Sequence, residues 1–506
     1  MMLSPLIWLP LIGALVIGLV PNLSEKQART SAIAVSSAIL LWTIVLMFNF
    51  NLSVPGFQMQ EYHAWIPTLG ISYSLAVDGL SLPLLALGSL ITALVAFSGT
   101  FGLKTGEVLQ RPRLFYSMLL IVNAGVAGAF LAQNLLLFFL FYELELVPFY
   151  LLILIWGGQK REYAAMKFLI YTAMSGMLIL AGFLGVTWLS HAPSFDYADI
   201  NVAALPQNAQ LILLTLLLVG FGIKTPLVPL HTWLPDTYVE ASTPVAILLG
   251  GILAKLGTYG LVRFCLGLFP DSWQLVSPGL AIIAAVSILY GALSALAQHD
   301  IKRMVAFSSI AHMGYVLLGA AALTPLAMVG AVSQMVAHGL ILALLFYLVG
   351  LVEAKTGTRD RDILNGLLNP IRGLPLTSAL LILAAMASAG IPGLAGFVAE
   401  FLVFQGSFAR FPWQTLIAIL GTGLTAVYFV ILLNRTCFGK LDNKTAYFPK
   451  VRFVEYVPAL ALTALIFWLG IQPTWLVCWS EQTTKALVTA ALPQAEQVAF
   501  NSADRS

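Results

Sequence analysis

The residues best suited to chemistry in this 506-residue chain are charged side chains embedded in apolar segments. Lys224 and Lys255 lie in such segments, together with the carboxylates Glu143, Glu145 and Glu400. Each charge costs about 2.5–3.5 kcal/mol at the centre of a membrane helix. We therefore expect these groups to face the interior of a helix bundle and to pair there. Since the distance between a lysine and a carboxylate controls proton uptake and release, the set predicts a proton relay.

Two histidines add titratable groups within the apolar segments. His338 lies within residues 336–339 of an apolar segment, where hydrophobic packing does not explain a histidine. It is therefore expected to join the relay. His312 lies nearer a helix end, so a relay role and a packing role stay equally open. Glu145 follows Glu143 by two positions, about 200° around a regular helix. We therefore expect Glu145 to stand outside the relay and to face a neighbouring subunit. A structural alternative stays open for the whole set, namely ion pairs that only fix helix packing.

The composition restricts the class of protein. Hydrophobic residues make up 59% of the chain and charged residues only 9%, whereas soluble domains have roughly 25% charged residues. The chain is therefore expected to be an integral membrane protein surrounded by lipids. A net charge of +3 without a basic surface cluster argues against a nucleic-acid partner. Three scattered cysteines, with no C-x-x-C pair and no H-E-x-x-H motif, predict neither a bound metal nor a redox cofactor in this chain.

Apolar segments long enough to cross a membrane recur along the whole sequence. A spanning helix needs about 20 apolar residues, so we expect an all-α polytopic membrane protein with about 14 transmembrane helices. The expected spans are 3–20, 31–50, 80–100, 114–131, 135–156, 166–189, 210–230, 245–268, 279–297, 304–322, 326–352, 374–404, 413–437 and 456–477. The first span follows no basic segment, so we expect it to be retained and not cleaved as a signal peptide.

Two of the expected spans are interrupted by helix-breaking residues. The seventh contains Pro226 directly after Lys224-Thr225, and the twelfth contains Gly390, Pro392 and Gly393 before Glu400. Broken helices in corresponding positions indicate an inverted-repeat transporter. Helices 4–8 and 9–13 form two sets of five, and the broken helix is the fourth in each set. Because five is an odd number, the second set must cross the membrane in the opposite direction to the first.

These repeats predict how the chain divides. Residues 1–113 are expected to form an N-terminal three-helix region, 114–268 the first five-helix repeat and 279–437 the second, inverted repeat. Residues 438–506 are expected to hold the last transmembrane helix and a C-terminal tail. Most of the 25 Lys and Arg residues fall in the connections on one side of the membrane. The positive-inside rule makes that side cytoplasmic, so both termini are expected on the opposite, lumenal side.

The chain resembles a known family, the antiporter-like proton-pumping subunits of complex I. The resemblance is to chain 4 of the NAD(P)H–quinone oxidoreductase of cyanobacteria and chloroplasts. It rests on the segments LLLFFLFYELELVPFYLLILIWGG (135–158), GFGIKTPLVPLHTWLPDTYVEASTPV (220–245), GGILAKLGTYGLVRF (250–264), DIKRMVAFSSIAHMGYVLLG (300–319) and GIPGLAGFVAEFLVF (390–404). The segment 365–375 is similar to the variant chain 4 of the cyanobacterial complex specialised for CO2 uptake.

The resemblance implies roles for individual residues in a proton relay. The residues concerned are Glu143, Lys224, Lys255, His312, His338 and Glu400. Glu143 and Lys224 correspond to the family's Glu–Lys pair, and Lys255 corresponds to its central lysine. The two histidines correspond to the connecting axis, and Glu400 to the distal acid.

The resemblance also implies the setting of the reaction. Electron transfer to plastoquinone elsewhere in the complex would supply the energy, and this subunit would translocate protons in a thylakoid membrane without a redox cofactor of its own. NAD(P)H or ferredoxin and the iron–sulfur clusters would bind elsewhere in the complex. The partners implied are other membrane-arm subunits, including sister antiporter-like subunits. One alternative is a subunit of a multi-component Na+/H+ antiporter, and another is a membrane anchor without a transport role.

Overall fold

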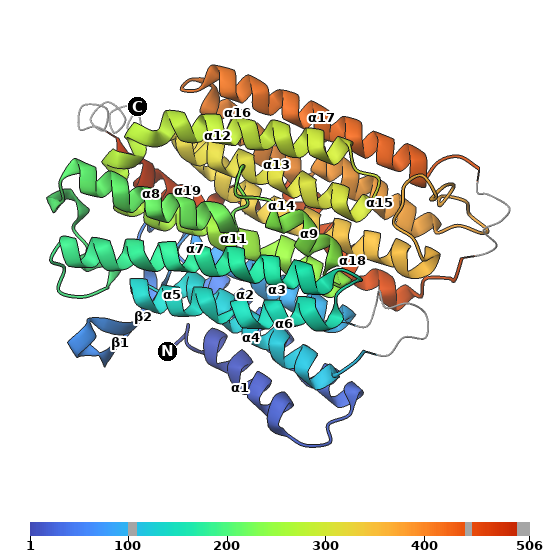
Figure 1. Cartoon of the computed structure of the whole chain (residues 1–506), viewed down its shortest axis with the longest axis horizontal. Helices are drawn as coiled ribbons and strands as arrows, with labels where there is room; N and C mark the ends of the chain where they lie inside the picture. The colour runs from blue at the N-terminus through green and yellow to red at the C-terminus, as the bar shows by residue number, and fades with distance from the viewer. Residues whose placement is uncertain (100–108, 441–447, 493–506) are drawn as a thin grey trace.

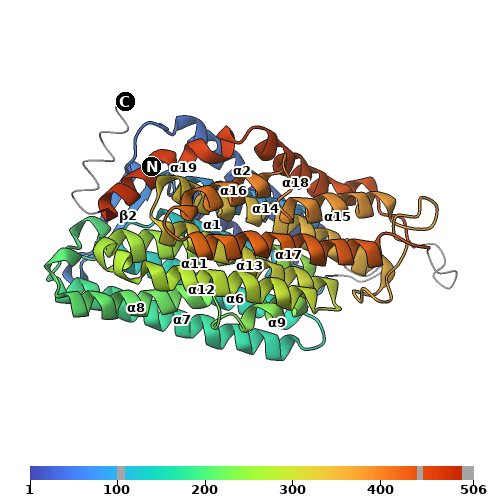
Figure 2. The same ribbon diagram turned by 90° about the horizontal axis from the view of Figure 1, so that it is seen from above.

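The computed structural model describes residues 1–99, 109–440 and 448–492. The chain forms a bundle of long helices that run side by side (Figures 1 and 2). Its helices and strands, in chain order, are α1 (Pro5–Leu19), α2 (Glu25–Asn49), β1 (Gln58–Ile66), β2 (Ile71–Val77), α3 (Ser81–Ser98), α4 (Pro112–Leu131), α5 (Leu135–Leu144), α6 (Leu146–Trp156), α7 (Arg161–Leu189), α8 (Gln207–Lys224), α9 (Trp233–Glu240), α10 (Thr243–Leu248), η4 (Leu249–Leu253), α11 (Ala254–Gly260), η5 (Leu261–Leu266), α12 (Pro270–Leu296), α13 (Ile301–Ala322), α14 (Pro325–Thr356), α15 (Pro375–Ser388), α16 (Ala395–Phe408), α17 (Pro412–Thr436), α18 (Phe453–Ile471) and α19 (Thr474–Ala491).

The all-α membrane fold expected from the sequence is confirmed. Over the described residues, 12 spans are long and apolar enough to cross a membrane, and α1, α15 and α16 are shorter apolar helices. Each expected span coincides with one of these helices or with a consecutive pair. The division of the chain into two inverted repeats stays a prediction.

Both expected breaks are present, and glycine or proline causes each of them. The seventh span ends as α8 at Lys224 and resumes as α9, with Pro226 in the gap. The twelfth span is divided into α15 and α16, and between them Gly390 (φ +69°) and Gly393 (φ +92°) adopt left-handed conformations that other residues rarely adopt. Each break interrupts the regular hydrogen-bond ladder of its span.

Three elements go beyond the expected architecture. The fifth span is divided into α5 and α6 at Glu145, and the eighth contains two π-helical segments, η4 and η5. An antiparallel hairpin of β1 and β2 connects α2 to α3. Another helix, α19, follows the last expected span. The N-terminus, the hairpin and the end of α19 lie toward the same end of the bundle (Figures 1 and 2).

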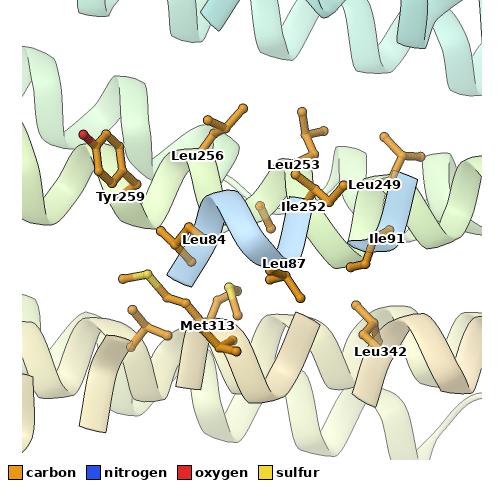
Figure 3. Close-up of a cluster of buried hydrophobic side chains, with 14 of the residues drawn as sticks. Leu84, Leu87, Ile91, Leu249, Ile252, Leu253, Leu256, Tyr259, Met313 and Leu342 are labelled. Carbon is orange, nitrogen blue, oxygen red and sulfur yellow. The ribbon is translucent and has the colours of Figure 1, made fainter. Parts of the chain in front are cut away.

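An apolar core surrounds the centre of the bundle. α3 lies against the eighth span on one side and against α13 and α14 on the other, and its Leu84, Leu87 and Ile91 pack into this space (Figure 3). Ile252 and Leu342 from the facing helices complete the layer and are almost fully buried. Charged side chains on the same helices are therefore held in a medium with little water.

Basic connections gather at the opposite end of the bundle. The backbone N–H of Ile301 donates to the carbonyl of Arg359, and that of Arg361 donates to the carbonyl of His299, each at 3.0 Å. Nearby, Asp236 forms ion pairs with both Lys167 (2.7 Å) and Arg303 (2.9 Å). These connections, far apart in the sequence, therefore form one basic end.

Candidate functional site

The charged residues singled out from the sequence lie inside the bundle and not against lipid. Six of these residues are at most 3% exposed: Glu145, Lys224, Lys255, His312, His338 and Glu400. Glu143 is half-buried. Such burial in an apolar bundle requires partners for each charge, and two groups of contacts supply them.

The first group lies where α8 ends against α5 and α6. The Nζ atom of Lys224 is 2.5 Å from Oε1 of Glu145. The same ammonium lies 3.5 Å from the centre of the Tyr142 ring, a cation–π contact, and 3.4 Å from the Tyr142 carbonyl. Lys224 is the last residue of α8, where the negative end of the helix dipole stabilises a cation.

The partner of Lys224 corrects an expectation from the sequence. Glu143 was expected to pair with Lys224 and Glu145 to face a neighbouring subunit, but the ion pair joins Lys224 to Glu145. The cause is Pro148, whose ring conflicts with the carbonyl four residues earlier, at Leu144. The helix breaks at Glu145, and the break turns this carboxylate inward. Pro148 was the sequence signal that could have identified it.

Glu143 points toward a different helix. Its carboxylate packs directly on the Cα of Gly176 in α7, where any larger residue would displace it. The hydroxyl of Tyr142 lies 3.1 Å from that of Ser175, which donates to the Gly220 carbonyl at 2.7 Å. These contacts tie α5, α7 and α8 together around the two acids and the lysine.

The second group begins at Lys255 in α11. Its ammonium donates to the Gly250 carbonyl (2.5 Å) and contacts Nδ1 of His338 in α14 at 2.9 Å. Gly250 belongs to the π-helical segment η4. Such segments interrupt the regular hydrogen-bond ladder and are frequent at functional sites. The irregular helix therefore supplies a carbonyl that holds the lysine in place.

A line of neighbouring ionisable side chains leads on from His338, whose Nε2 has no hydrogen-bond partner among the described residues. Its ring centre lies 5.3 Å from that of His312 in α13. Nδ1 of His312 lies 3.4 Å from Oε1 of Glu400 in α16. The line therefore joins all four second-group residues that the sequence singled out, from Lys255 to Glu400.

Neutral side chains that the sequence did not single out orient this line. The Gln334 amide lies 3.2 Å from Nδ1 of His312, and the Ser388 hydroxyl lies 3.0 Å from Nε2. Thr422 donates to Oε2 of Glu400 at 3.0 Å. Serine and threonine recur throughout the apolar segments, so no sequence signal distinguished Ser388 and Thr422. Gln334, an uncharged amide inside an apolar span, was passed over because only ionisable residues were singled out. Ser388 is the last residue of α15. The hydrogen-bond partner of His312 therefore lies directly at the break in the twelfth span.

Close backbone packing connects the two groups. A Cβ on Gly257 of α11 would lie only 2.7 Å from the Thr225 nitrogen and 3.0 Å from the Lys224 carbonyl carbon. The buried Thr225 hydroxyl has no hydrogen-bond partner among the described residues. The end of α8 therefore rests on the helix that carries Lys255, and the Thr225 hydroxyl lies at this contact, beside Gly257.

No group of three or more His, Cys, Asp and Glu side chains with metal-binding geometry occurs in residues 1–99, 109–440 and 448–492. Asp78, just before α3, accepts from the backbone N–H groups of Leu80 and Ser81 and also forms a buried ion pair with Arg263. That pair lies outside the line described above and ties the start of α3 to η5.

Two family descriptions match most of the chain. Residues 132–425 match the family "NADH:quinone oxidoreductase/Mrp antiporter, TM", and residues 29–126 match "NADH-ubiquinone oxidoreductase chain 4, amino terminus". The central match contains every residue of the two contact groups.

Curated relatives and solved structures agree with these matches. The chain is 43% identical to NAD(P)H-quinone oxidoreductase chain 4-2 of Synechocystis sp. over 86% of its length and 78% of the relative's. It is 40% identical to NAD(P)H-quinone oxidoreductase chain 4 1 of Picosynechococcus sp., over 99% of this chain and 95% of the relative.

Among solved structures, a chain of respiratory complex I from Thermus thermophilus superposes with a TM-score of 0.87 at 26% identity, over 97% of this chain and 100% of that one. A chain of the Mrp complex from Dietzia sp. shares the fold, with a TM-score of 0.86 at 22% identity over 97% and 99%. Full-length identity near 40% decides between these related groups. The chain belongs to the family of chain 4 membrane subunits of NAD(P)H-quinone oxidoreductase, within the wider NADH:quinone oxidoreductase/Mrp antiporter family.

Proposed function

We propose that this chain is a proton-translocating membrane subunit of a NAD(P)H-quinone oxidoreductase and that its two contact groups form the relay. The observation that carries the proposal is the series from Lys255 through His338 and His312 to Glu400, with polar contacts of 2.9 Å and 3.4 Å at its two ends and neighbouring histidine rings, 5.3 Å between centres, in the middle. Lys224, Glu145 and Glu143 form the other half of the relay. Intramembrane ionisable groups that face a bundle interior mark proton and ion pathways.

The histidines supply the reversible steps of this relay. Nδ1 of His338 accepts from Lys255, which leaves Nε2 to carry the proton. Nδ1 of His312 faces both the donor amide of Gln334 and the acceptor carboxylate of Glu400. It cannot accept from one and donate to the other in a single protonation state. A proton arriving at Nδ1 therefore exchanges the Gln334 contact for the Glu400 contact, and the proton moves toward the distal acid.

Water is the proposed connector where side chains do not touch. Buried polar atoms of Thr225, Ser309, Ser333, Gln334 and His338 have no hydrogen-bond partner among the described residues. Buried groups of this kind are commonly satisfied by ordered water. The Thr225 hydroxyl is the proposed carrier position between Lys224 and Lys255.

The energy for the relay would come from quinone reduction elsewhere in the complex. The nicotinamide or ferredoxin donor and the iron–sulfur clusters belong to other subunits, and sister antiporter-like subunits would flank this one. By the positive-inside rule the basic end of the bundle faces the cytoplasm and the N-terminus faces the thylakoid lumen. The C-terminus, expected on the same side from the sequence, lies outside the described residues. The segment 365–375 further supports the CO2-uptake form, which the identity of the flanking chains in the intact complex would test.

A Na+/H+ antiporter subunit is the competing function, because the Mrp chain shares the fold. Its 22% identity supports the fold alone, whereas the chain 4 relatives reach 40–43%. Affinity purification of the tagged chain from native membranes separates the two. We expect a quinone-reducing peripheral arm to copurify, and small antiporter subunits in its place would overturn the assignment.

Lys224→Ala and Glu143→Ala test the relay. We expect each variant to leave an assembled, electron-transferring complex that translocates fewer protons per electron. Acidification of sealed vesicles, divided by the rate of electron transfer, gives this ratio. Lys160→Ala, at an exposed residue of the basic end, is the matched control and should not change it. Normal proton translocation in the Lys224→Ala complex would contradict the relay. Loss of assembly equal to the loss of pumping would support the membrane-anchor alternative.

A further inference from the structure

An apolar groove lies between α1 and α4 on the outer face of the bundle, away from the relay. Its volume is about 860 Å³, within the range of about 300–1,000 Å³ typical of ligand sites. α1 and α4 line it with large aliphatic side chains, among them Leu11, Leu15, Leu19, Leu114, Met118 and Ile121. α1 forms one edge of the molecule, so the groove opens toward the surroundings of the bundle (Figure 1).

Small residues bring the two helices together and leave the groove beside their contact line. The Ser117 hydroxyl donates to the Ala14 carbonyl at 3.0 Å. A Cβ on Gly18 would lie 3.4 Å from the same hydroxyl, and one on Gly13 would lie 3.1 Å from Leu120. Because the backbones approach closely along this line, the longer side chains beside it form the walls of the groove.

Two arginines stand at one end of this otherwise apolar groove. Arg111 and Arg113 both line it. Arg113 donates to the carbonyls of Ile17 (3.2 Å) and Gly18 (2.5 Å) at the end of α1, which fixes the guanidinium at the mouth. Arg111 is exposed and adopts a left-handed backbone conformation, with φ of +49°. Guanidinium groups provide several N–H donors in a planar arrangement that matches phosphate and similar anions.

The length of the groove matches one leaflet of a bilayer. Trp8 and Leu19 both line it, and a helix rise of 1.5 Å per residue places them about 16 Å apart. The hydrocarbon core of a membrane is about 30 Å thick, so one leaflet contributes about 15 Å. A molecule with an anionic head at the arginines and about 16 Å of hydrocarbon behind it fits this geometry.

We propose that this groove binds an anionic membrane lipid, with its acyl chains along α1 and α4 and its head group against Arg111 and Arg113. Basic pockets between transmembrane helices on the cytoplasmic side are suited to anionic head groups. A helix from a neighbouring subunit fits less well. Membrane proteins concentrate Lys and Arg at the cytoplasmic ends of their helices, so a partner helix would bring further positive charge to the two arginines. The proposal is independent of the relay.

Photo-crosslinking in the intact complex tests the site. The complex is reconstituted into vesicles of phosphatidylcholine that contain either phosphatidylglycerol or additional phosphatidylcholine with the same photoreactive acyl chain. Mass spectrometry then gives the yield of lipid adducts on α1 and α4. We expect several-fold more adducts from phosphatidylglycerol. Arg111→Gln should lower that yield about fivefold, the change expected for one basic side chain at an anionic lipid surface. Lys160→Gln, at an exposed basic residue outside the groove, should leave the yield unchanged.

Two further measurements in the same vesicles identify the occupant of the groove. Leu15→Trp fills the groove, and we expect it to reduce adducts from both lipids. A photoreactive amino acid placed at Ile12 reports the occupant directly. Equal yields from the two lipids with the unmodified chain would overturn the proposal, and so would an unchanged yield in Arg111→Gln. Crosslinking of the Ile12 position to a protein subunit would assign the groove to a neighbouring helix. The comparison of the two lipids needs no variant, so it holds even where Arg111→Gln fails to assemble.

Discussion

Lys224 pairs with Glu145 across a 2.5 Å contact, whereas Glu143, two residues earlier, packs on Gly176 of another helix. The ammonium and the Glu145 carboxylate are almost completely buried. One lysine thus has one acid in direct contact and a second acid close by but held elsewhere. A change in the α5–α6 junction would transfer the lysine between the two carboxylates, because Glu145 lies at the break and Glu143 lies two residues before it.

The Lys224–Glu145 pair predicts strong coupling between its two residues. Removing one partner of a buried ion pair costs about 3–5 kcal/mol, whereas replacing both is often nearly neutral. We expect Glu145→Gln and Lys224→Gln each to lower the thermal midpoint of the purified complex, and the double variant to melt at or above both single variants. A double variant that melts below both would show that the pair does not exist in the folded chain.

Gly176 offers a way to move Glu143 without altering a charge. In Gly176→Ala the new methyl group displaces only the end of a flexible side chain, and alanine favours the helix by about 0.5–1 kcal/mol. We expect an assembled complex with normal thermal stability and fewer protons translocated per electron. Gly185→Ala on the same helix is the control, because its methyl group displaces an end of Leu213 and no acid. Equal proton ratios in the two variants would remove Glu143 from the relay.

Much of the fold could be predicted from the sequence because lipid imposes simple requirements. Length of apolar sequence identified the spans, and Gly390, Gly393 and Pro226 identified the breaks. The β1–β2 hairpin and α19 were not predicted, because neither contains the long apolar segment that identifies a membrane span. Within the site, ionisable residues in apolar segments were conspicuous. The partner of Lys224 was not predicted, because in a regular helix Glu145 would point away from the face that carries Glu143.

The contacts of His312 show the same limit at a finer scale. The sequence left its role open, and its partners Ser388 and Gln334 come from two other helices. Which neutral hydroxyl or amide meets a given histidine depends on helix rotation and on the break after Ser388. Neither quantity follows from residue type or spacing. The relay roles of these residues stay predictions until the variants are measured.

Glu61 in the hairpin predicts an acid-sensitive attachment of α1. Burial raises the pKa of Glu61, but hydrogen bonds from the Ser4 hydroxyl (2.5 Å) and from the backbone N–H groups of Leu3 and Ser4 outweigh it and hold the pKa below its usual 4.5. A lowered pKa in the folded state adds stability at pH values above 4.5, and that stability is lost as the pH falls through the folded pKa.

Hydrogen exchange at the start of α1, corrected for the intrinsic pH dependence, measures this attachment. We expect protection of residues 3–8 to decrease below a pH of about 4.5 in the unmodified chain. In Glu61→Gln the protection should be lower at neutral pH and nearly independent of pH in the acid range. A variant that retains the acid transition would place the titrating group elsewhere.

Gly257 predicts how tightly the two halves of the relay must pack. A methyl group there meets the backbone of Lys224 and Thr225, which cannot turn aside as a side chain can. We expect Gly257→Ala to destabilise the complex by about 1–3 kcal/mol, as overpacking does, and to lower proton translocation by separating Lys224 from Lys255. Gly423→Ala is the matched control, because that exposed helical position has nothing within 4 Å of the added methyl group. The control should be neutral or stabilise by up to about 1 kcal/mol. If both variants behaved alike in thermal stability and proton ratio, the contact between α8 and α11 would have no part in connecting the lysines.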